Sequence, residues 1–199
     1  NPNPSDPSTE QAPMYRVAYH NDIKGVRLLM EAGARIHDSD NFMHSAVNAA
    51  AFHGSHSLLK WFAKSGFDYS ASKTGSDRSP FLSAVLSNDF RTMKLLVKLG
   101  ANPLALDKSG SSALHLFVYG VSNGKNSRES EVVPVDDVVR YLVRTCGIDP
   151  NVKARGDGIT ALHIASECSL VPVAYALLRY GADVNSADSR GKSFMLSSL

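Results

Sequence analysis

The sequence predicts an all-α repeat array, and a glycine period together with helical apolar stretches predicts it. Glycines recur with gaps of 33, 34, 47 and 34 residues, at Gly33, Gly66, Gly100, Gly147 and Gly181. Each follows an apolar stretch with helical spacing. Three of these stretches contain the leucine pairs Leu28-Leu29, Leu95-Leu96 and Leu177-Leu178. A period of about 33 residues is typical of arrays in which each unit buries its apolar face only against its neighbours.

The same glycines predict where helices end. A glycine just after a helix supplies the left-handed cap that strains a residue with a Cβ. Twelve residues before four of these glycines stands another turn residue: Asn21, Gly54, Asn88 and Ser169. Asparagine and glycine tolerate the left-handed conformation best. We therefore expect a short turn between two helices in each unit.

A longer motif recurs in this register and is most complete in the fifth unit. Residues 157–165 read D-G-I-T-A-L-H-I-A, and residues 181–185 read G-A-D-V-N. The Ser/Thr before the helix can accept a hydrogen bond from a free backbone N–H. The order and spacing resemble the ankyrin repeat, whose pattern is D-x-x-G-x-T-P-L-H-x-A-A, a turn, a second apolar helix and G-A-D-V-N. The resemblance covers roughly residues 11–199 and implies a solenoid of paired antiparallel helices with β-hairpin or turn loops.

The other units are weaker copies. Residues 107–116 keep Gly110, Leu114 and His115, whereas residues 79–82 read S-P-F-L and residues 45–48 read S-A-V-N. We expect a polar N-terminal segment at residues 1–11 and an ankyrin-repeat domain over residues 12–199. Its units are expected at residues 12–39, 40–73, 74–106, 107–154 and 155–187, with a partial sixth at 188–199.

About 14 extra residues fall between the helices of the fourth unit. Residues 121–134 (VSNGKNSRESEVVP) are polar, with Gly124, three serines and a terminal proline, which is typical of a loop. A helix is expected to resume over residues 135–143. Two interpretations stay open: a solvated excursion, or a partner contact or phosphorylation site around Ser127 and Ser130.

Composition limits the kinds of partner. The 199 residues are 43% hydrophobic and 20% charged, and 21 basic against 19 acidic residues leave a net charge of +2. This balance predicts no electrostatic footprint for nucleic acid. No apolar run approaches the ~20 residues of a membrane-spanning helix. We expect a monomer whose partner is neither nucleic acid nor membrane.

The two cysteines, Cys146 and Cys168, are predicted to be free thiols. In the repeat register they end different helices, about nine helical residues or ~13 Å apart, beyond the ~7 Å that a disulfide spans. Free thiols favour a reducing compartment, so an intracellular location is expected. The polar stretch Asn1–Pro13 has no signal-peptide character. A segment removed before Asn1, and with it a secreted effector, stays open.

No catalytic or cofactor motif is present. The chain has no G-x-x-x-x-G-K-[ST], no G-x-G-x-x-G after a strand, no H-E-x-x-H and no C-x-x-C. We expect no enzyme activity, catalytic residue, cofactor or metal. The resemblance implies that His115 and His163 join neighbouring units by hydrogen bonds. A zinc site of His20, His44 and His53 is disfavoured because no fourth ligand is evident.

The resemblance also implies a concave groove, formed by the hairpin tips and the exposed side of each first helix. The binding residues predicted there are Tyr19, His20, Phe42, His44, Phe52, His53, Arg78, Lys108, Tyr119, Asp157 and Glu167. Aromatic residues and arginine dominate interface hot spots, so Tyr19, Phe42, Phe52, Arg78 and Tyr119 are the expected contacts. The alternative is that some of them pack against the N-terminal segment or adjacent hairpins.

Two further residues are notable. Trp61 lies in the second helix of the second unit, where core or convex-face packing is favoured over recognition. Leu177 followed by Asp183-Val184-Asn185 looks like the ankyrin sequence that a factor-inhibiting-type dioxygenase hydroxylates. Asn185 is therefore a predicted hydroxylation site, and the alternative is an asparagine that ties the hairpin turn.

We expect a non-catalytic module that captures a partner protein or extended peptide on the groove through a rigid, preorganised surface. Two alternatives stay open. The unfinished sixth unit favours a regulatory or targeting segment of a larger enzyme, channel or receptor. The degenerate repeats favour a secreted pathogen effector that binds a host protein.

Overall fold

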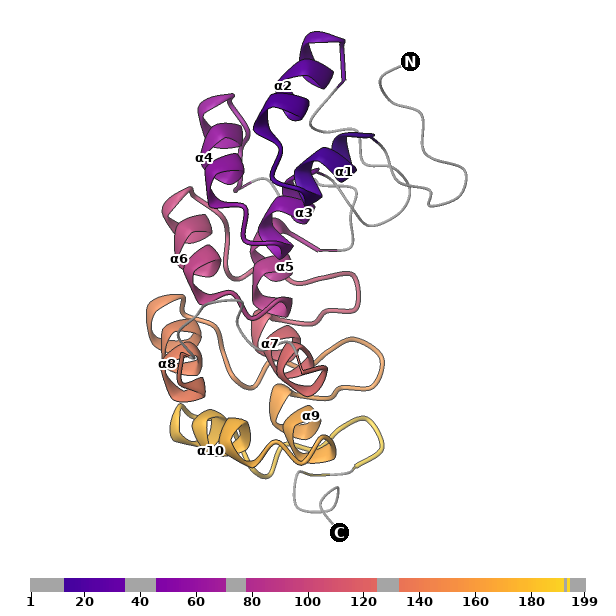
Figure 1. Ribbon diagram of the computed structural model, residues 1–199. Helices are drawn as coiled ribbons and strands as arrows, with labels where there is room; N and C mark the ends of the chain where they lie inside the picture. The colour runs from indigo at the N-terminus through magenta and orange to yellow at the C-terminus, as the bar shows by residue number, and fades with distance from the viewer. Residues whose placement is uncertain (1–12, 35–45, 71–77, 125–132, 192, 194–199) are drawn as a thin grey trace. The chain divides into compact units, whose positions relative to one another are not determined.

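The computed structural model describes residues 13–34, 46–70, 78–124, 133–191 and 193. These residues form helices joined by turns (Figure 1). In chain order the helices are α1 (Pro13–Tyr19), α2 (Ile23–Glu31), α3 (Ala46–Phe52), α4 (His56–Lys64), α5 (Pro80–Leu86), α6 (Phe90–Lys98), α7 (Ala113–Ser122), α8 (Val135–Arg140) with its π-helical continuation η1 (Tyr141–Thr145), α9 (Ala161–Glu167) and α10 (Val171–Arg179). An isolated antiparallel bridge joins Ala187 and Ser193. The predicted all-α fold class is confirmed.

The helices fall into two compact units. Unit 1 comprises Asn1–Ala84 and Arg91–Asn102, and unit 2 comprises Val85–Phe90 and Pro103–Leu199. The division cuts α5 after Ala84 and α6 after Phe90.

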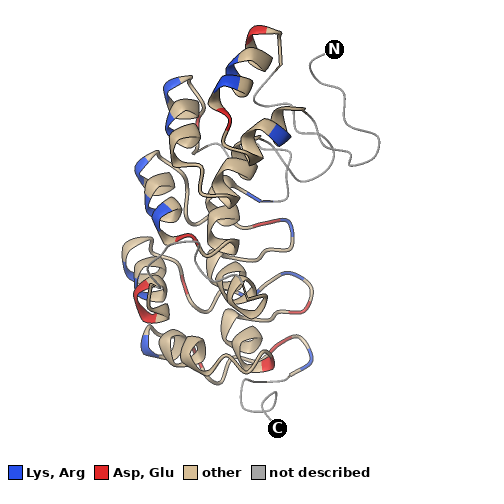
Figure 2. Cartoon of the chain, viewed as in Figure 1, with Lys and Arg blue, Asp and Glu red and all other residues tan. Residues whose placement is uncertain are grey.

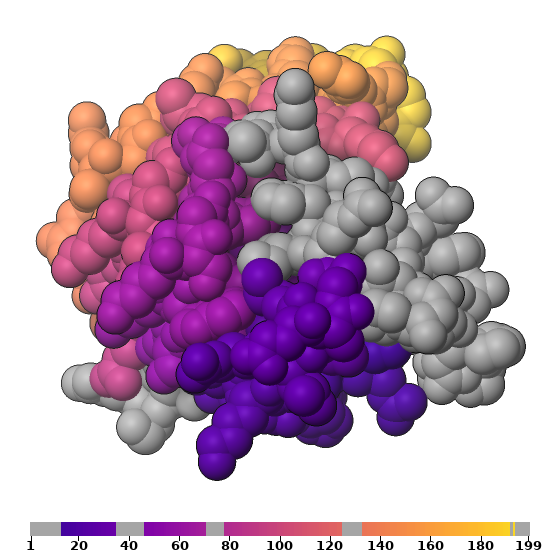
Figure 3. Space-filling view, turned by 90° about the horizontal axis from the view of Figure 1, so that it is seen from above, coloured from indigo at the N-terminus to yellow at the C-terminus, as the bar shows by residue number. Residues whose placement is uncertain are grey.

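In unit 1 the first helices form the inner layer. α1 packs against α3, and each also contacts the second helix of its own pair, α2 or α4. Seen from above, the indigo surface of α1 and α2 lies against the purple surface of α3 and α4 (Figure 3). Six of the seven residues of α3 are buried, four of them alanines, which lets neighbouring helices approach closely. The Tyr69 hydroxyl closes the loop after α4 by donating to the Leu59 carbonyl at 2.7 Å.

Unit 2 is held by helix packing and by bonds between successive turns. α7 packs against α9, and α10 packs against both α8 and α9. The Arg155 N–H donates to the Ser109 carbonyl at 2.7 Å, and the Ser189 N–H donates to the Asp157 carbonyl at 2.8 Å. These bonds join the turns that precede α7 and α9 and the turn near residue 189.

The predicted left-handed turns are confirmed. Asn21, Gly54, Asn88 and Ser169 have φ of 54°, 68°, 57° and 54°. The five phase-marking glycines have φ between 74° and 100°. The backbone conformation explains why these residue types recur, since other residues would be strained there.

The fourth helix pair differs from the prediction in where its helices end. α7 has ten residues against seven in α1, α3, α5 and α9, and it extends through Ser122 into the segment predicted as loop. Gly124, with φ of 66°, then takes the left-handed turn position. The second helix runs from Val135 to Thr145 because a π-helical turn continues it beyond the predicted end at residue 143. Ser127 and Ser130 lie outside the described residues.

Both cysteines are free, as predicted. Cys146 is buried at the end of η1, and burial raises the pKa of its thiol. Cys168 is exposed at the end of α9.

Candidate functional site

Four of the predicted groove residues meet in unit 1. Tyr19 ends α1, and its ring centroid lies 4.1 Å from that of His53 and 5.0 Å from that of His20. The Phe52 ring lies 5.1 Å from His53 in an edge-to-face arrangement. The packing of α1 on α3 brings their C-terminal ends together, because Tyr19 ends α1 and His53 follows α3. We call Tyr19, His20, Phe52 and His53 the Tyr19 cluster.

A small hollow adjoins the Tyr19 cluster. Tyr15, Arg16, Tyr19 and His20 line about 170 Å³ of space at the surface of α1. The Tyr15 and Tyr19 rings lie 6.3 Å apart, and burial raises the pKa of Tyr15, with Tyr19 adding to the shift. The hollow has room for a single side chain, and Arg16 places a positive charge at its wall.

The other predicted residues of unit 1 are not part of the Tyr19 cluster. Arg78 is half-buried before α5, and its backbone carbonyl accepts a hydrogen bond from the Asn48 amide at 2.9 Å. Phe42 and His44 lie outside the described residues.

In unit 2, Tyr119 lies among acidic side chains. Its side chain on α7 is 37% exposed, and α7 packs against α9, which ends at Glu167. Burial raises the pKa of Tyr119, and Asp157, Glu167 and Asp107 raise it further. The negative charges of the predicted residues Asp157 and Glu167 therefore act on Tyr119. Lys108 is exposed in the turn before α7.

His115 has the predicted structural role. The Ser112 N–H donates to His115 Nδ1 at 3.2 Å, and the Ser112 hydroxyl lies 2.8 Å from the same nitrogen. An Nδ1 that accepts leaves the proton on Nε2, which lies 3.1 Å from the Ile159 carbonyl and donates to it. The ring thus caps α7 and joins it to the turn before α9. Burial lowers the pKa of His115, which favours this neutral form.

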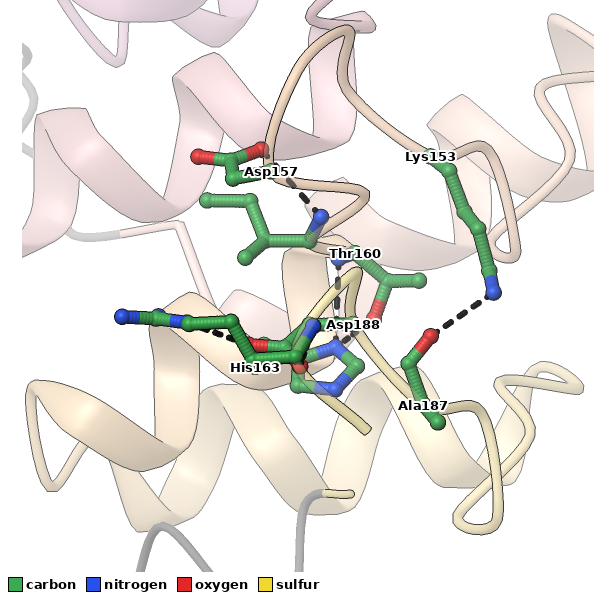
Figure 4. A network of polar contacts seen from close by, with 8 residues as sticks. Lys153, Asp157, Thr160, His163, Ala187 and Asp188 are labelled. Carbon is green, nitrogen blue, oxygen red and sulfur yellow. Dashed lines mark hydrogen bonds and ion pairs between the residues drawn. The ribbon is translucent and has the colours of Figure 1, made fainter. Parts of the chain in front are cut away.

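His163 caps α9 in the next repeat in the same way as His115 caps α7. Its Nδ1 accepts from the Thr160 N–H at 3.2 Å and lies 2.8 Å from the Thr160 hydroxyl. Figure 4 shows the ring beside Thr160 with Asp188 close by, and the hydrogen bond from Lys153 to the Ala187 carbonyl in the same network.

Asn185, the predicted hydroxylation site, is exposed in the turn after α10. Its N–H donates to an Asp183 carboxylate oxygen at 2.9 Å. Asn151 occupies the same position in the preceding repeat, and its side chain joins two turns by hydrogen bonds. It donates to the Gly181 carbonyl at 3.0 Å and accepts from the Asp183 N–H at 2.7 Å. The asparagine of this motif therefore has a structural use, and hydroxylation of Asn185 stays a prediction.

Several exposed apolar residues were not predicted from the sequence. Leu28 on α2 is 66% exposed, although it belongs to the apolar face that the leucine pairs predicted. Tyr175 on α10 is 70% exposed, because the helix buries Val173, Ala174 and Leu177 instead. Helical periodicity could have placed Tyr175 outside, since its neighbours on either side define the buried face.

Within the described ranges, no three or more His, Cys, Asp or Glu side chains gather as metal ligands would. Of the helices that the structure describes, none has the length and apolar character needed to cross a bilayer.

The capped helix pairs and the bonds between their turns define a helical repeat protein. Residues 81–188 match the family described as ankyrin repeats (3 copies), and residues 43–97 match one described as ankyrin repeats (many copies). The chain belongs to the ankyrin-repeat family and, as such, is a protein-interaction module.

The chain is similar to parts of several longer proteins. The chain is 28% identical to human B-cell lymphoma 3 protein over 153 residues, 76% of this chain and 31% of that protein. It is 30% identical to the nuclear factor NF-kappa-B p105 subunit of Gallus gallus over 137 residues, 57% of this chain and 14% of the subunit. It is 27% identical to the phosphocholine transferase AnkX of Legionella pneumophila over 146 residues, 73% of this chain and 14% of that enzyme. The chain thus spans less than a third of the length of these relatives.

Proposed function

We propose that the chain captures a partner protein or an extended peptide on the side of its first helices, the face expected to form the concave groove. The observation that carries this proposal is the Tyr19 cluster. Its central tyrosine is 46% exposed yet is held in place by ring contacts to two histidines.

Preorganisation is the physical reason for choosing this surface. Interface hot spots are rich in tyrosine, and a tyrosine that is already positioned loses little side-chain entropy on binding. The helices α1 and α3 that carry the cluster pack directly on each other. Arg16, in the adjacent hollow, would attract an acidic or carboxylate group of the partner.

The Tyr119 region of unit 2 is proposed as a second contact of the opposite charge preference. The negative charges of Asp107, Asp157 and Glu167 act on this partly exposed tyrosine, which favours a basic residue of a partner there. Arg78, before α5, and Lys108, in the turn before α7, are further proposed contacts.

The test begins with a peptide library selected against the full chain. The affinity of a selected peptide is then compared for wild type, the double variant Tyr19→Ala/Phe52→Ala and the control Tyr175→Ala. We expect at least about a tenfold loss for the double variant, because hot-spot truncations exceed ~1.4 kcal/mol. The control removes an equally large tyrosine, 70% exposed on α10, and should keep wild-type affinity. Thermal unfolding of each variant checks that it is folded, and unchanged affinity in a folded double variant would refute the proposal.

The whole protein that carries this module has two further proposed roles. One is a regulatory segment of a larger enzyme, channel or receptor, and the other is a secreted effector. Sequencing of the flanking coding regions separates them: catalytic or channel motifs favour the first, and an upstream signal peptide favours the second over an intracellular location.

A further inference from the structure

The second helices of unit 1 concentrate positive charge. The helices α2 and α4 and the part of α6 from Arg91 to Lys98 hold seven basic residues and one acidic residue, Glu31. Seven is a third of the 21 basic residues of the chain, whose net charge is only +2. All seven are exposed, and we call them the basic ladder: Lys24, Arg27, Lys60, Lys64, Arg91, Lys94 and Lys98. Figure 2 shows this charge along α2, α4 and α6.

The repeat register places the basic ladder on one side of unit 1. α2 and α4 belong to pairs whose first helices, α1 and α3, pack together, and Figure 1 draws α2, α4 and α6 in succession on the same side. A 2.8 Å hydrogen bond between His56 Nε2 and Thr92 Oγ1 joins the first turns of α4 and α6. The sides of the three helices that face the core carry Val26, Leu58, Phe62, Met93 and Leu96.

An apolar row runs beside the basic charges. Arg27, Lys60 and Lys94 occupy one position in the three helices, and the next position holds the apolar residues Leu28, Trp61 and Leu95. Leu28 is 66% exposed, whereas Trp61 and Leu95 are half-buried. The face therefore offers positive charge next to apolar surface, repeated once per helix.

We propose that this face binds an acidic, amphipathic helix of a partner protein, at a site separate from the first-helix surface. Neighbouring packed helices lie about 8–10 Å apart. A partner helix advances about 10.5 Å in seven residues and keeps the same face toward the ladder. An extended strand advances ~10 Å in three residues, which turns the side chain to its other face. Acidic residues at every seventh position, each with an apolar neighbour, therefore match the ladder and the apolar row together.

Other polyanions fit less well. A membrane surface requires apolar side chains that protrude into the lipid, but two of the three members of the apolar row are half-buried. A nucleic acid backbone offers phosphates and sugars, and neither would cover the exposed Leu28 side chain. Both polyanions are nevertheless arms of the test.

The test uses the full chain and a designed peptide. The peptide is a helix-forming 21-mer, by design three heptads of about 10.5 Å each, with glutamate at every seventh position and leucine beside it. A scrambled peptide of the same composition is the control. Binding is measured by fluorescence anisotropy at about 0.15 M salt, where only short-range charge contacts persist. We expect the designed peptide to bind at least about tenfold more tightly than the scrambled one.

Charge-reversal variants locate the site. Lys60→Glu/Lys94→Glu should lower the affinity for the designed peptide about tenfold or more, and Leu28→Ser should lower it severalfold. Arg144→Glu/Arg155→Glu makes the same change in net charge at exposed positions of unit 2 and should leave affinity unchanged. Tyr19→Ala/Phe52→Ala should also leave it unchanged, so this proposal and the proposed function can fail separately.

Several results would overturn the proposal. Equal binding of the scrambled peptide, or an equal loss in the unit 2 control variant, would mean non-specific charge attraction. Loss of binding in Tyr19→Ala/Phe52→Ala would place the peptide on the first-helix surface. Tighter binding of phosphatidylserine vesicles or of a DNA duplex at the same salt would assign the face to a different polyanion.

Discussion

Replacing His115 with alanine should weaken the attachment of α7 to the turn that precedes α9. The side chain is 1% exposed and is bonded at both ring nitrogens, to Ser112 in its own unit and to Ile159 forty-four residues later. A ring used in this way is part of the scaffold, so its removal should reduce stability, and it contributes no side chain to the Tyr19 cluster or the basic ladder.

The magnitude follows from what each partner loses. The buried Ser112 N–H would lose its acceptor, which costs about 1–3 kcal/mol. The Ile159 carbonyl still accepts from the Ala154 N–H at 2.9 Å, so losing the cross-repeat bond should cost only about 1 kcal/mol. With some cavity cost added, we expect His115→Ala to destabilise the protein by about 3 kcal/mol.

Replacing His115 with glutamine separates the cost of losing the Ser112 cap from the cost of losing the bond to Ile159. Glutamine at the third helical position completes a capping box with Ser112, so His115→Gln should keep the cap and lose the bond to Ile159. Its expected cost is about 1–1.5 kcal/mol.

Urea unfolding followed by circular dichroism measures these costs as shifts in midpoint at an unchanged slope. Lys24→Ala, at an exposed position of α2, is the control and should change stability by less than ~0.5 kcal/mol. A cost below ~1 kcal/mol for His115→Ala, or equal costs for alanine and glutamine, would refute the two-bond account.

Two more predictions concern the same unit. Because burial lowers the pKa of His115 in the folded state, its neutral ring contributes stability that is complete above the unfolded pKa of about 6.5 and is lost as pH falls toward the lower folded value. The urea midpoint should therefore fall between about pH 7 and pH 5, and less so in His115→Gln; parallel profiles for the two proteins would argue against this origin. Gly120→Ala would place a Cβ 2.5 Å from the Leu86 carbonyl oxygen, so the overpacking cost of about 1–3 kcal/mol should exceed the ~1 kcal/mol gain in helix propensity. An unchanged or raised melting temperature, compared with the exposed Ser122→Ala, would show that α7 shifts freely.

Local backbone requirements explain which parts of the fold could be predicted. The left-handed turns at Asn21, Asn88 and Ser169 allow few residue types, so the sequence records them directly. The end of α7 has no such requirement. Ser122 and Asn123 are typical of loops, yet the helix continues through Ser122, and Val118 and Gly120 near its end are buried. The burial of these residues depends on neighbouring helices, so the two polar residues alone could not predict this boundary.

The residues of the candidate site could be predicted in part from the repeat period. The 33-residue period placed Phe52 one repeat after Tyr19, and the structure brings both residues to His53. Periodicity shows which residues share a helix face, but it does not show whether a neighbour covers that face. Helical spacing placed the Leu28-Leu29 pair on an apolar face, but Leu28 is 66% exposed and Val26 is the buried residue of α2.

The net charge predicted the least about the surface, because a total charge does not show where the charged residues lie. A net charge of +2 excluded a strongly basic protein but could not show that α2, α4 and α6 hold seven of the basic residues. The repeat period turns that local excess into a surface, since one basic position per second helix becomes a row once the helices stack.

The same period also separates the two proposed surfaces of unit 1. Tyr19 and Arg27 are only eight residues apart, but the left-handed turn at Asn21 reverses the chain between them. One side chain thus belongs to the first-helix surface and the other to the basic ladder, with the core of the unit between α1 and α2. Tyr19→Ala should therefore leave binding at the basic ladder unchanged, and Arg27→Ala should leave binding at the Tyr19 cluster unchanged. A repeat that buries only its middle layer can in this way offer two chemically different surfaces from one short stretch of sequence.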